Sequence, residues 1–485
     1  MPRKRVVMIL ADGTRPDVFE DHLLAGHLPH IADAFPEGHR RSAFTVFPTT
    51  TGPAFLPFMT GMFPGQMNLP GIRWFDRRAY SSGEGSASRS YVGVESWGMN
   101  TDVDRSFKTI FDLEPDSLNI FSAVSPGLDK SGELARFSRG FWWLLGHETN
   151  RWDLVHLRAR KHMLKALDQD PRFLFLVIPD VDSLCHISNP RSTTVSEAYG
   201  RLDETVGLLF GELDRRNWRD DTLVMIVSDH GGSEVRNHLG LPEWMEQRGM
   251  RPYYYPRIWR RHFDSSVMIS GNGMAHIHLR NGEKWTPEPV NDEEILLRHG
   301  DFLKDLIERP EIDLVVTRSG DGTVVARSRR GESRMNWTAS GSVEYTPVSG
   351  DAFGYDGLAG VLTRDDFLCR TRDTKYPDGA VQLLQIVESS RTGDIIVSAE
   401  VGHDLRDKHE RPEHFAGHGA LHREHMCVPW FSTRPLPDVP LRTVDVFPEV
   451  LRWLDLPVPE GIDGRLIEDI YACSVPDTTT TQASR

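Results

Sequence analysis

The stretch Val6-Val7-Met8-Ile9-Leu10, followed by Ala11-Asp12-Gly13, has the pattern on which the fold can be predicted. Two later stretches repeat it: FLFLVI at residues 173–178 ends at Pro179-Asp180-Val181-Asp182, and LVMIV at residues 223–227 ends at Ser228-Asp229-His230. Short apolar runs bounded by turn residues are typical of strands that are buried on both faces. A fourth run, DIIVSA at residues 394–399, precedes a loop that is rich in histidine.

Helical sequence, for example residues 196–213, lies between these runs. This alternation predicts an α/β fold with a largely parallel central sheet and helices on both faces. We expect residues 1–75, 165–240 and 390–470 to form this core, residues 76–164 and 241–389 to be mainly inserted cap elements, and residues 474–485 to be a disordered tail.

Composition narrows the class of protein. The chain has 485 residues with a net charge of −14, which argues against general binding to nucleic acid. Its four cysteines, none in a CxxC pair, do not form a disulfide framework, so a reducing compartment is expected. The N-terminal apolar run is too short for a signal peptide or a transmembrane span. We therefore predict a cytoplasmic protein.

Metal-binding side chains follow the predicted strands. Asp182 and His186 are four residues apart, so both share one face of a helical turn. Asp229 and His230 end one strand, Asp12 ends another, and His418 lies in the histidine-rich loop. Each feature alone has an ordinary structural explanation, such as a helix cap or a turn. Together, at the carboxyl ends of successive strands, they predict a site for divalent zinc or manganese.

A threonine is the candidate nucleophile. The segment FPTTTGPAF at residues 47–55 places three threonines before a Gly-Pro turn that enters a helix. A metal-bound threonine hydroxyl loses its proton readily and can attack phosphorus. A simple helix cap is the alternative.

At this point the sequence resembles the alkaline phosphatase superfamily, in its type I phosphodiesterase/nucleotide pyrophosphatase-like branch. The resemblance rests on these segments, in the order of the family: ILADGTRPD, FPTTTGPAF, TGMFP, PDVDSLCH, VSDHGG, GHGALHREHMCVP and TVDVFPEVLRWLDLPVPEGIDG. It implies two metal ions, usually zinc with manganese as the alternative. One ion would be held by Asp12, Thr51, Asp229 and His230, and the other by Asp182, His186 and His418. Thr51 would be the nucleophile, because it directly precedes Gly52-Pro53.

The resemblance implies hydrolysis of phosphodiester or pyrophosphate bonds of a small phosphorylated substrate through a phospho-threonine intermediate. Related phosphodiesterases commonly carry Asn-His after the proline, where this chain has Ala54-Phe55. Asn68 and Arg73 are the candidates to bind phosphate instead. The alternatives are a phosphomonoesterase, a phosphonate hydrolase or, from another class, a catalytically inactive metal-binding module.

Two aromatic stretches have no assigned function: Phe141, Trp142, Trp143 and Trp152, and YYYPRIWRRHF at residues 253–263. They could contact a base or a lipid headgroup, or could be packed parts of the cap. Peripheral contact with a membrane and the oligomeric state therefore stay open.

Overall fold

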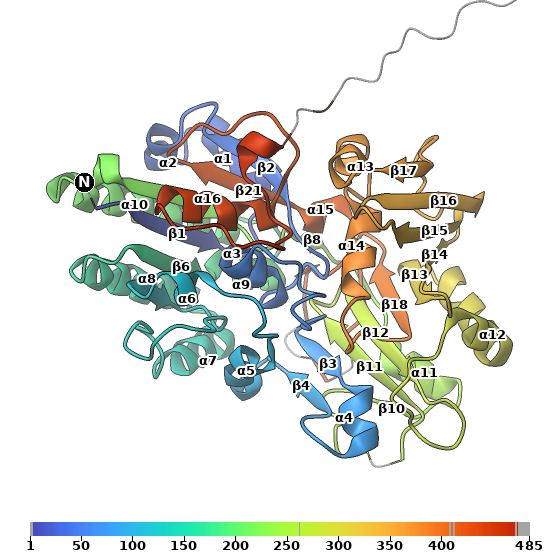
Figure 1. Ribbon diagram of the computed structural model, residues 1–485. Coiled ribbons are helices and arrows are strands. Elements are labelled where there is room, and N and C mark those ends of the chain that lie inside the picture. Colours follow the sequence, from blue (N-terminus) through green and yellow to red (C-terminus); the bar gives the residue numbers. More distant parts are fainter. Residues whose placement is uncertain (1–2, 261, 407–408, 411–412, 471–472, 474–485) are drawn as a thin grey trace, which may run out of the picture.

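A computed structural model describes residues 3–260, 262–406, 409–410, 413–470 and 473, and the predicted tail at residues 474–485 lies outside them. The three predicted strands lie side by side at the centre of one sheet (Figure 1). β1 (Arg5–Ala11) pairs in parallel with both β6 (Phe173–Ile178) and β7 (Thr222–Val227). Every residue of these strands is buried, as expected for strands covered on both faces.

This seven-stranded sheet has the order β22-β2-β21-β7-β1-β6-β5. Its pairs are parallel except where β21 meets β7 and β2. The remaining strands are β2 (Arg40–Phe44), β5 (Ser117–Ile120), β21 (Cys427–Ser432) and β22 (Leu441–Arg442). The predicted α/β fold with a largely parallel central sheet is confirmed.

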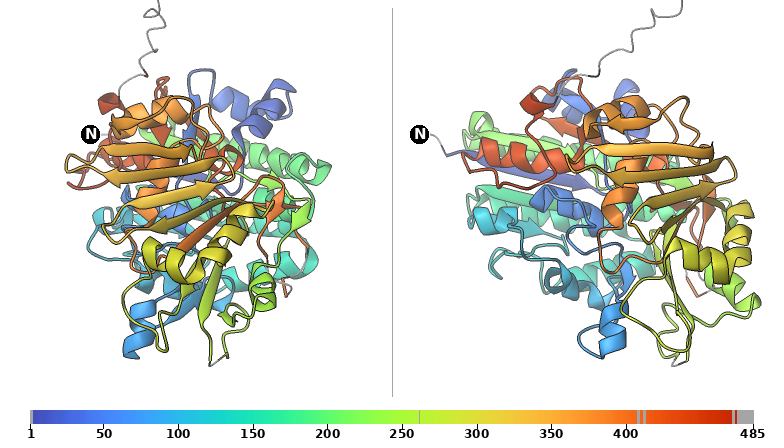
Figure 2. Two further views of the ribbon diagram at one scale, coloured as in Figure 1. Left: turned by 90° about the vertical axis from the view of Figure 1, so that its right-hand side faces the viewer. Right: turned by 45° about the vertical axis from the view of Figure 1, so that its right-hand side comes forward.

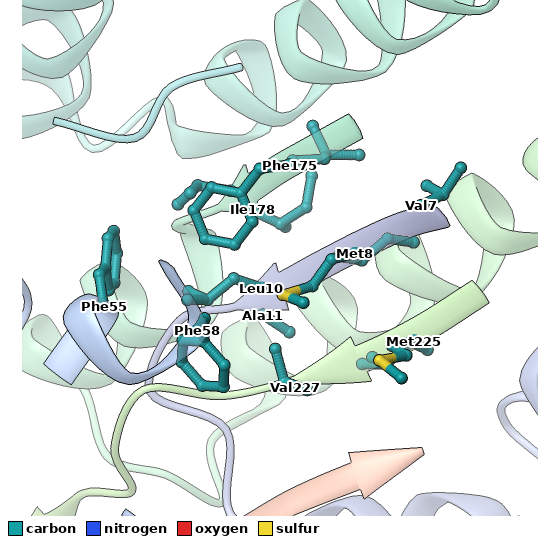
Figure 3. Close-up of a cluster of buried hydrophobic side chains, with 14 of the residues drawn as sticks. Val7, Met8, Leu10, Ala11, Phe55, Phe58, Phe175, Ile178, Met225 and Val227 are labelled. Carbon is teal, nitrogen blue, oxygen red and sulfur yellow. The ribbon is translucent and has the colours of Figure 1, made fainter. Parts of the chain in front are cut away.

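Helices flank this sheet (Figure 1). In Figure 3, Phe55 and Phe58 of one short helical segment lie beside Leu10 of β1 and Phe175 of β6 in the buried core. The flanking helices are α1 (Pro16–Leu24), α2 (Pro29–Ala34), α3 (Leu56–Thr60), α6 (Ile110–Leu113), α7 (Arg139–Thr149), α8 (Trp152–Leu167), α9 (Asp180–Ile187), α10 (Thr193–Arg215), α15 (Arg423–Met426) and α16 (Val446–Trp453).

A second, nine-stranded sheet lies beside the first, and it faces the viewer in the left view of Figure 2. Its order is β10-β11-β12-β18-β13-β14-β15-β16-β17, antiparallel except between β10 and β11. The strands are β10 (Pro252–Tyr253), β11 (Ser265–Ser270), β12 (Met274–Leu279), β13 (Ile312–Arg318), β14 (Val324–Ser328), β15 (Gly331–Trp337), β16 (Val343–Gly350), β17 (Gly360–Leu362) and β18 (Ile395–Ala399). Helices α11 (Leu241–Gln247), α12 (Asp292–Glu308), α13 (Arg364–Thr371) and α14 (Gly379–Ile386) accompany it.

The structure departs from the predicted division of the chain in two places. β5, from the segment predicted as an insertion, is the edge strand of the first sheet. The apolar run at residues 394–399, predicted in the core, forms β18 at the centre of the second sheet. In addition, Cys369 and Cys473 are joined in a disulfide, which the spacing of the cysteines did not predict.

Candidate metal centre

The seven predicted site residues converge at the carboxyl ends of β1, β6 and β7. Asp12 directly follows β1, and Asp229 and His230 follow β7 after one serine. α9, the short helix after β6, carries Asp182 and His186, as the four-residue spacing predicted. Parallel strands bring their carboxyl ends to one edge, so these side chains meet although they are far apart in sequence.

Two overlapping sets of ligand atoms lie close enough for metal ions. The ligand atoms of Asp12, Asp229 and His230 lie within 4.8 Å of one another, as do those of Asp182, His230 and His418. His186 belongs beside the second set, because its Nε2 lies 3.2 Å from Oδ2 of Asp182.

Thr51 lies in the turn before a short helical segment, as predicted, with Pro53–Phe55 in a 3₁₀ turn that leads into α3. Its Oγ1 is 3.1 Å from Nε2 of His230. Gly52 makes this turn possible with a φ of +98°, a conformation that side chains with a Cβ rarely adopt. The hydroxyl therefore faces the cluster of ligands.

Three histidines are oriented by the backbone. Nδ1 lies 2.9 Å from the Ala416 carbonyl in His186, 3.0 Å from the Gly231 carbonyl in His230 and 2.9 Å from the Thr49 carbonyl in His418. A carbonyl only accepts, so each Nδ1 carries a proton and each ring presents its Nε2 to the site. This arrangement is typical of histidines that bind metal through Nε2.

The carboxylates also fit a cation. Oδ1 of Asp12 and Oδ2 of Asp229 are buried and have no hydrogen-bond partner in the described part of the chain. Burial and the neighbouring charges of Asp229 and Asp182 raise the pKa of Asp12 well above its usual range. Burial and the charge of Asp182 raise the pKa of Asp229 to about 7. A divalent cation would satisfy these oxygens and relieve their mutual repulsion.

In the second set, which contains Asp182, His230 and His418, neighbouring charges shift the pKa of the carboxylate in the opposite direction. Burial opposes ionisation of Asp182, but His186 and His418 outweigh it and lower its pKa. Burial lowers the pKa of His230 to about 4 and that of His418, with help from His230, to about 3. Neutral His230 and His418 are in the protonation state that a metal ion requires. Burial opposes protonation of His186, but the charge of Asp182 outweighs it and raises the pKa of His186 to about 9, so a metal ion would have to displace the proton on its Nε2.

The two phosphate-binding candidates lie in other contacts. Oδ1 of Asn68 accepts hydrogen bonds from Ser389 and Ser390, at 2.8 and 3.2 Å, and Nε of Arg73 donates to Ser90. None of these contacts involves one of the seven site residues. Ala54 is fully buried in a second apolar cluster with Val46, Phe47, Phe63 and Met274.

Two neighbours of the site were not predicted from the sequence. His414 lies beside His186, with ring centroids 4.4 Å apart, and its Nδ1 is 3.2 Å from Nδ2 of Asn272. Its only sequence signal is its place in a histidine-rich loop, which does not separate it from its neighbours.

Asp180 is the second neighbour, on the first turn of α9. Its Oδ2 accepts from Nδ1 of His156 at 2.9 Å and from Nε of Arg201 at 3.0 Å, and Nε2 of His156 lies 2.7 Å from Oγ1 of Thr205. This buried network ties α9, which carries Asp182 and His186, to α8 and α10.

Comparison with known proteins shows the family and the fold of the chain. The model of the type I phosphodiesterase / nucleotide pyrophosphatase family matches residues 6–421. No curated protein matches the chain. The solved structures that share its fold include the following two. Phosphonoacetate hydrolase from Sinorhizobium meliloti 1021 is 16% identical, with 93% of this chain and 96% of that chain covered and a TM-score of 0.57. Human ectonucleotide pyrophosphatase / phosphodiesterase 5 is 13% identical, with 94% and 96% covered and a TM-score of 0.55.

Proposed function

The chain belongs to the type I phosphodiesterase / nucleotide pyrophosphatase family of hydrolytic enzymes, and from this premise we propose that it hydrolyses phosphodiester or pyrophosphate bonds with two divalent metal ions and Thr51 as the nucleophile. The observation that carries the proposal is the hydroxyl of Thr51, which lies 3.1 Å from His230 within a buried cluster of carboxylates and histidines.

The donor set favours zinc, with manganese as the alternative, because it combines carboxylates and imidazoles without a thiolate. Asp12, Thr51, Asp229 and His230 would hold one ion, and Asp182, His186 and His418 would hold the other. When bound, such ions lower the pKa of the threonine hydroxyl and stabilise the negative charge that develops on the phosphoryl oxygens.

The residues of the chain then divide the work. Oγ1 of Thr51 loses its proton and forms a bond to phosphorus while the bond to the leaving oxygen breaks. Water cleaves the resulting phospho-threonine and restores the hydroxyl, so that one water is consumed in each turnover. The backbone carbonyls that accept from the three Nδ1 atoms keep the imidazoles aimed at the site throughout.

The charges of the site favour a diester over a monoester. In the part of the chain that the structure describes, Asp12, Asp182 and Asp229 form ion pairs with histidines and with no lysine or arginine. A phosphomonoester carries a second negative charge that a nearby cation would be needed to balance. A panel of chromogenic diesters, monoesters and phosphonates separates the three substrate classes.

The test of the nucleophile is Thr51→Ala, with Thr51→Ser as the matched control. We expect Thr51→Ala to lose about a thousandfold or more in kcat, as removal of a catalytic nucleophile does. The serine variant keeps a hydroxyl and should retain measurable turnover. Undiminished turnover in Thr51→Ala with its metal still bound would exclude the covalent role, and a wild-type protein without bound metal or activity would support the inactive module.

The location in the cell stays a proposal. The cytoplasm was predicted from the N-terminus and the few cysteines, whereas the Cys369–Cys473 disulfide is of a kind that persists in oxidising compartments. Mass spectrometry of the isolated protein after thiol alkylation, with and without reduction, tests whether these two cysteines are paired.

A further inference from the structure

An apolar strip runs along the outside of α7. Phe137 is 96% exposed, and Phe141 and Leu144 are each 60% exposed. Their spacing of four and three residues places them on one side of the helix and of the turn before it. We call these three residues the α7 patch.

The patch is exposed although the helix itself is well packed. The ring of Trp143 lies 5.2 Å from Phe121 and 6.2 Å from Trp152, and Trp152 is almost completely buried. The aromatic side chains on the inner side of α7 therefore anchor this helix, so this part of the Trp-rich sequence is packed inside the protein. Large apolar side chains that stay outside in a row on an anchored helix usually mark a contact surface.

The segment that carries the patch is rich in positive charge. Residues 130–165 contain eight Lys or Arg residues and three Asp or Glu residues, in a chain whose net charge is −14. Of the eight, Arg139 is buried, and Arg151 and Arg160 pair with Asp153 and Glu204. The guanidinium of Arg136 lies 5.8 Å from the centre of the Phe137 ring, and that of Arg158 lies 5.7 Å from the centre of the Trp142 ring. Basic and aromatic groups are thus interleaved at the same surface.

This surface is linked to the metal centre. α7 packs on α8, and α8 packs on α9, which carries Asp182 and His186. His147, in the last turn of α7, lies near the site: desolvation lowers its pKa, and the charges of His186 and Asp182 also act on it. Figure 1 shows α7 at the outer edge of the molecule, below α8.

We propose that the α7 patch docks the protein on the surface of an anionic phospholipid bilayer. Exposed Phe and Leu side chains enter the boundary between headgroups and acyl chains, and exposed Lys and Arg residues of the same segment are attracted to anionic headgroups. A neutral protein partner would not account for the local excess of positive charge. Within the described residues no helix is both long and apolar enough to cross a bilayer, so the contact is peripheral.

The experiment is co-sedimentation of the full-length protein with vesicles rich in phosphatidylglycerol and with vesicles of phosphatidylcholine alone. Wild-type protein should sediment with the anionic vesicles and be released by salt. The triple variant Phe137→Ala, Phe141→Ala and Leu144→Ala should bind the anionic vesicles at least about tenfold more weakly, because three inserting side chains are lost. A matched control is Leu24→Ala, Leu296→Ala and Leu297→Ala, which removes three side chains that are exposed elsewhere, and it should bind as the wild type does.

A separate variant, Lys161→Gln with Lys165→Gln, should reduce the preference for anionic vesicles. All five substituted positions in the two patch variants are at the surface, and circular dichroism should confirm that the variants are folded. The proposal is overturned if wild-type protein sediments with neither vesicle, or if the patch variant binds as tightly as the wild type. It is also overturned if the patch variant changes only self-association in analytical ultracentrifugation, because the occupant is then a second copy of the chain. Vesicle binding requires no hydrolysis, so this result is independent of the proposed reaction.

Discussion

Asp180→Ala tests whether the buried network behind α9 holds the metal ligands in place. Asp180 is completely buried, and its carboxylate accepts hydrogen bonds from His156 and Arg201. Removal of one partner from a buried charge network costs about 3–5 kcal/mol. We expect the lower end of this range, about 3 kcal/mol, because Arg201 is 22% exposed and can turn to water.

The free energy of unfolding should be measured by urea denaturation after removal of metal with a chelator, so that loss of metal does not contribute. The same variant should bind zinc about 10–100-fold more weakly, the usual effect of removing a partner that orients metal ligands. Asp153→Ala is the control: its carboxylate is exposed and pairs with exposed Arg151, so the loss should be within about 0.5 kcal/mol. If Asp180→Ala is destabilised but binds zinc with unchanged affinity, the network stabilises the fold without positioning the ligands.

Three further variants probe the surroundings of the site. Ala54→Asn should lower the free energy of unfolding by about 2–4 kcal/mol in urea denaturation, because an amide would be buried without partners, and it should not increase kcat. A stable, more active variant would show that position 54 does reach the substrate. Gly13→Ala should weaken zinc binding in calorimetric titration, because the new Cβ would lie 2.5 Å from Cβ of Asp182 at a φ of +70°, and unchanged affinity would mean that the backbone yields. His414→Ala should alter the visible spectrum of the cobalt-substituted protein, because the ring beside His186 is lost, while His414→Phe should preserve the wild-type spectrum. Equal spectra for the two variants would rule out an effect of this contact on the metal.

The central sheet and most of the site could be predicted because they depend on local sequence. The runs that became β1, β6 and β7 are continuous apolar segments, and Asp or His ligands follow each of them within eight residues. The spacing of Asp182 and His186 also fixes their relation on a single helix, whatever surrounds it.

The second sheet could not be predicted in the same way, because its pairs join distant segments. β18 pairs with both β12 and β13, and its apolar run resembles those of the first sheet. Its assignment therefore depends on tertiary pairing and not on composition. The contacts of His414 and Asp180, and the pairing of Cys369 with Cys473, likewise join segments that are distant in sequence.

The most direct measurement for the central claim is the number of metal ions per chain, determined by inductively coupled plasma mass spectrometry after zinc loading and removal of excess metal. The two sets of ligand atoms predict two ions in the wild type. They also predict one ion in a variant that lacks the carboxylate of Asp182, with the set of Asp12, Asp229 and His230 intact. A single ion in the wild type, or an Asp182→Ala variant that still retains two, would contradict the two-metal centre.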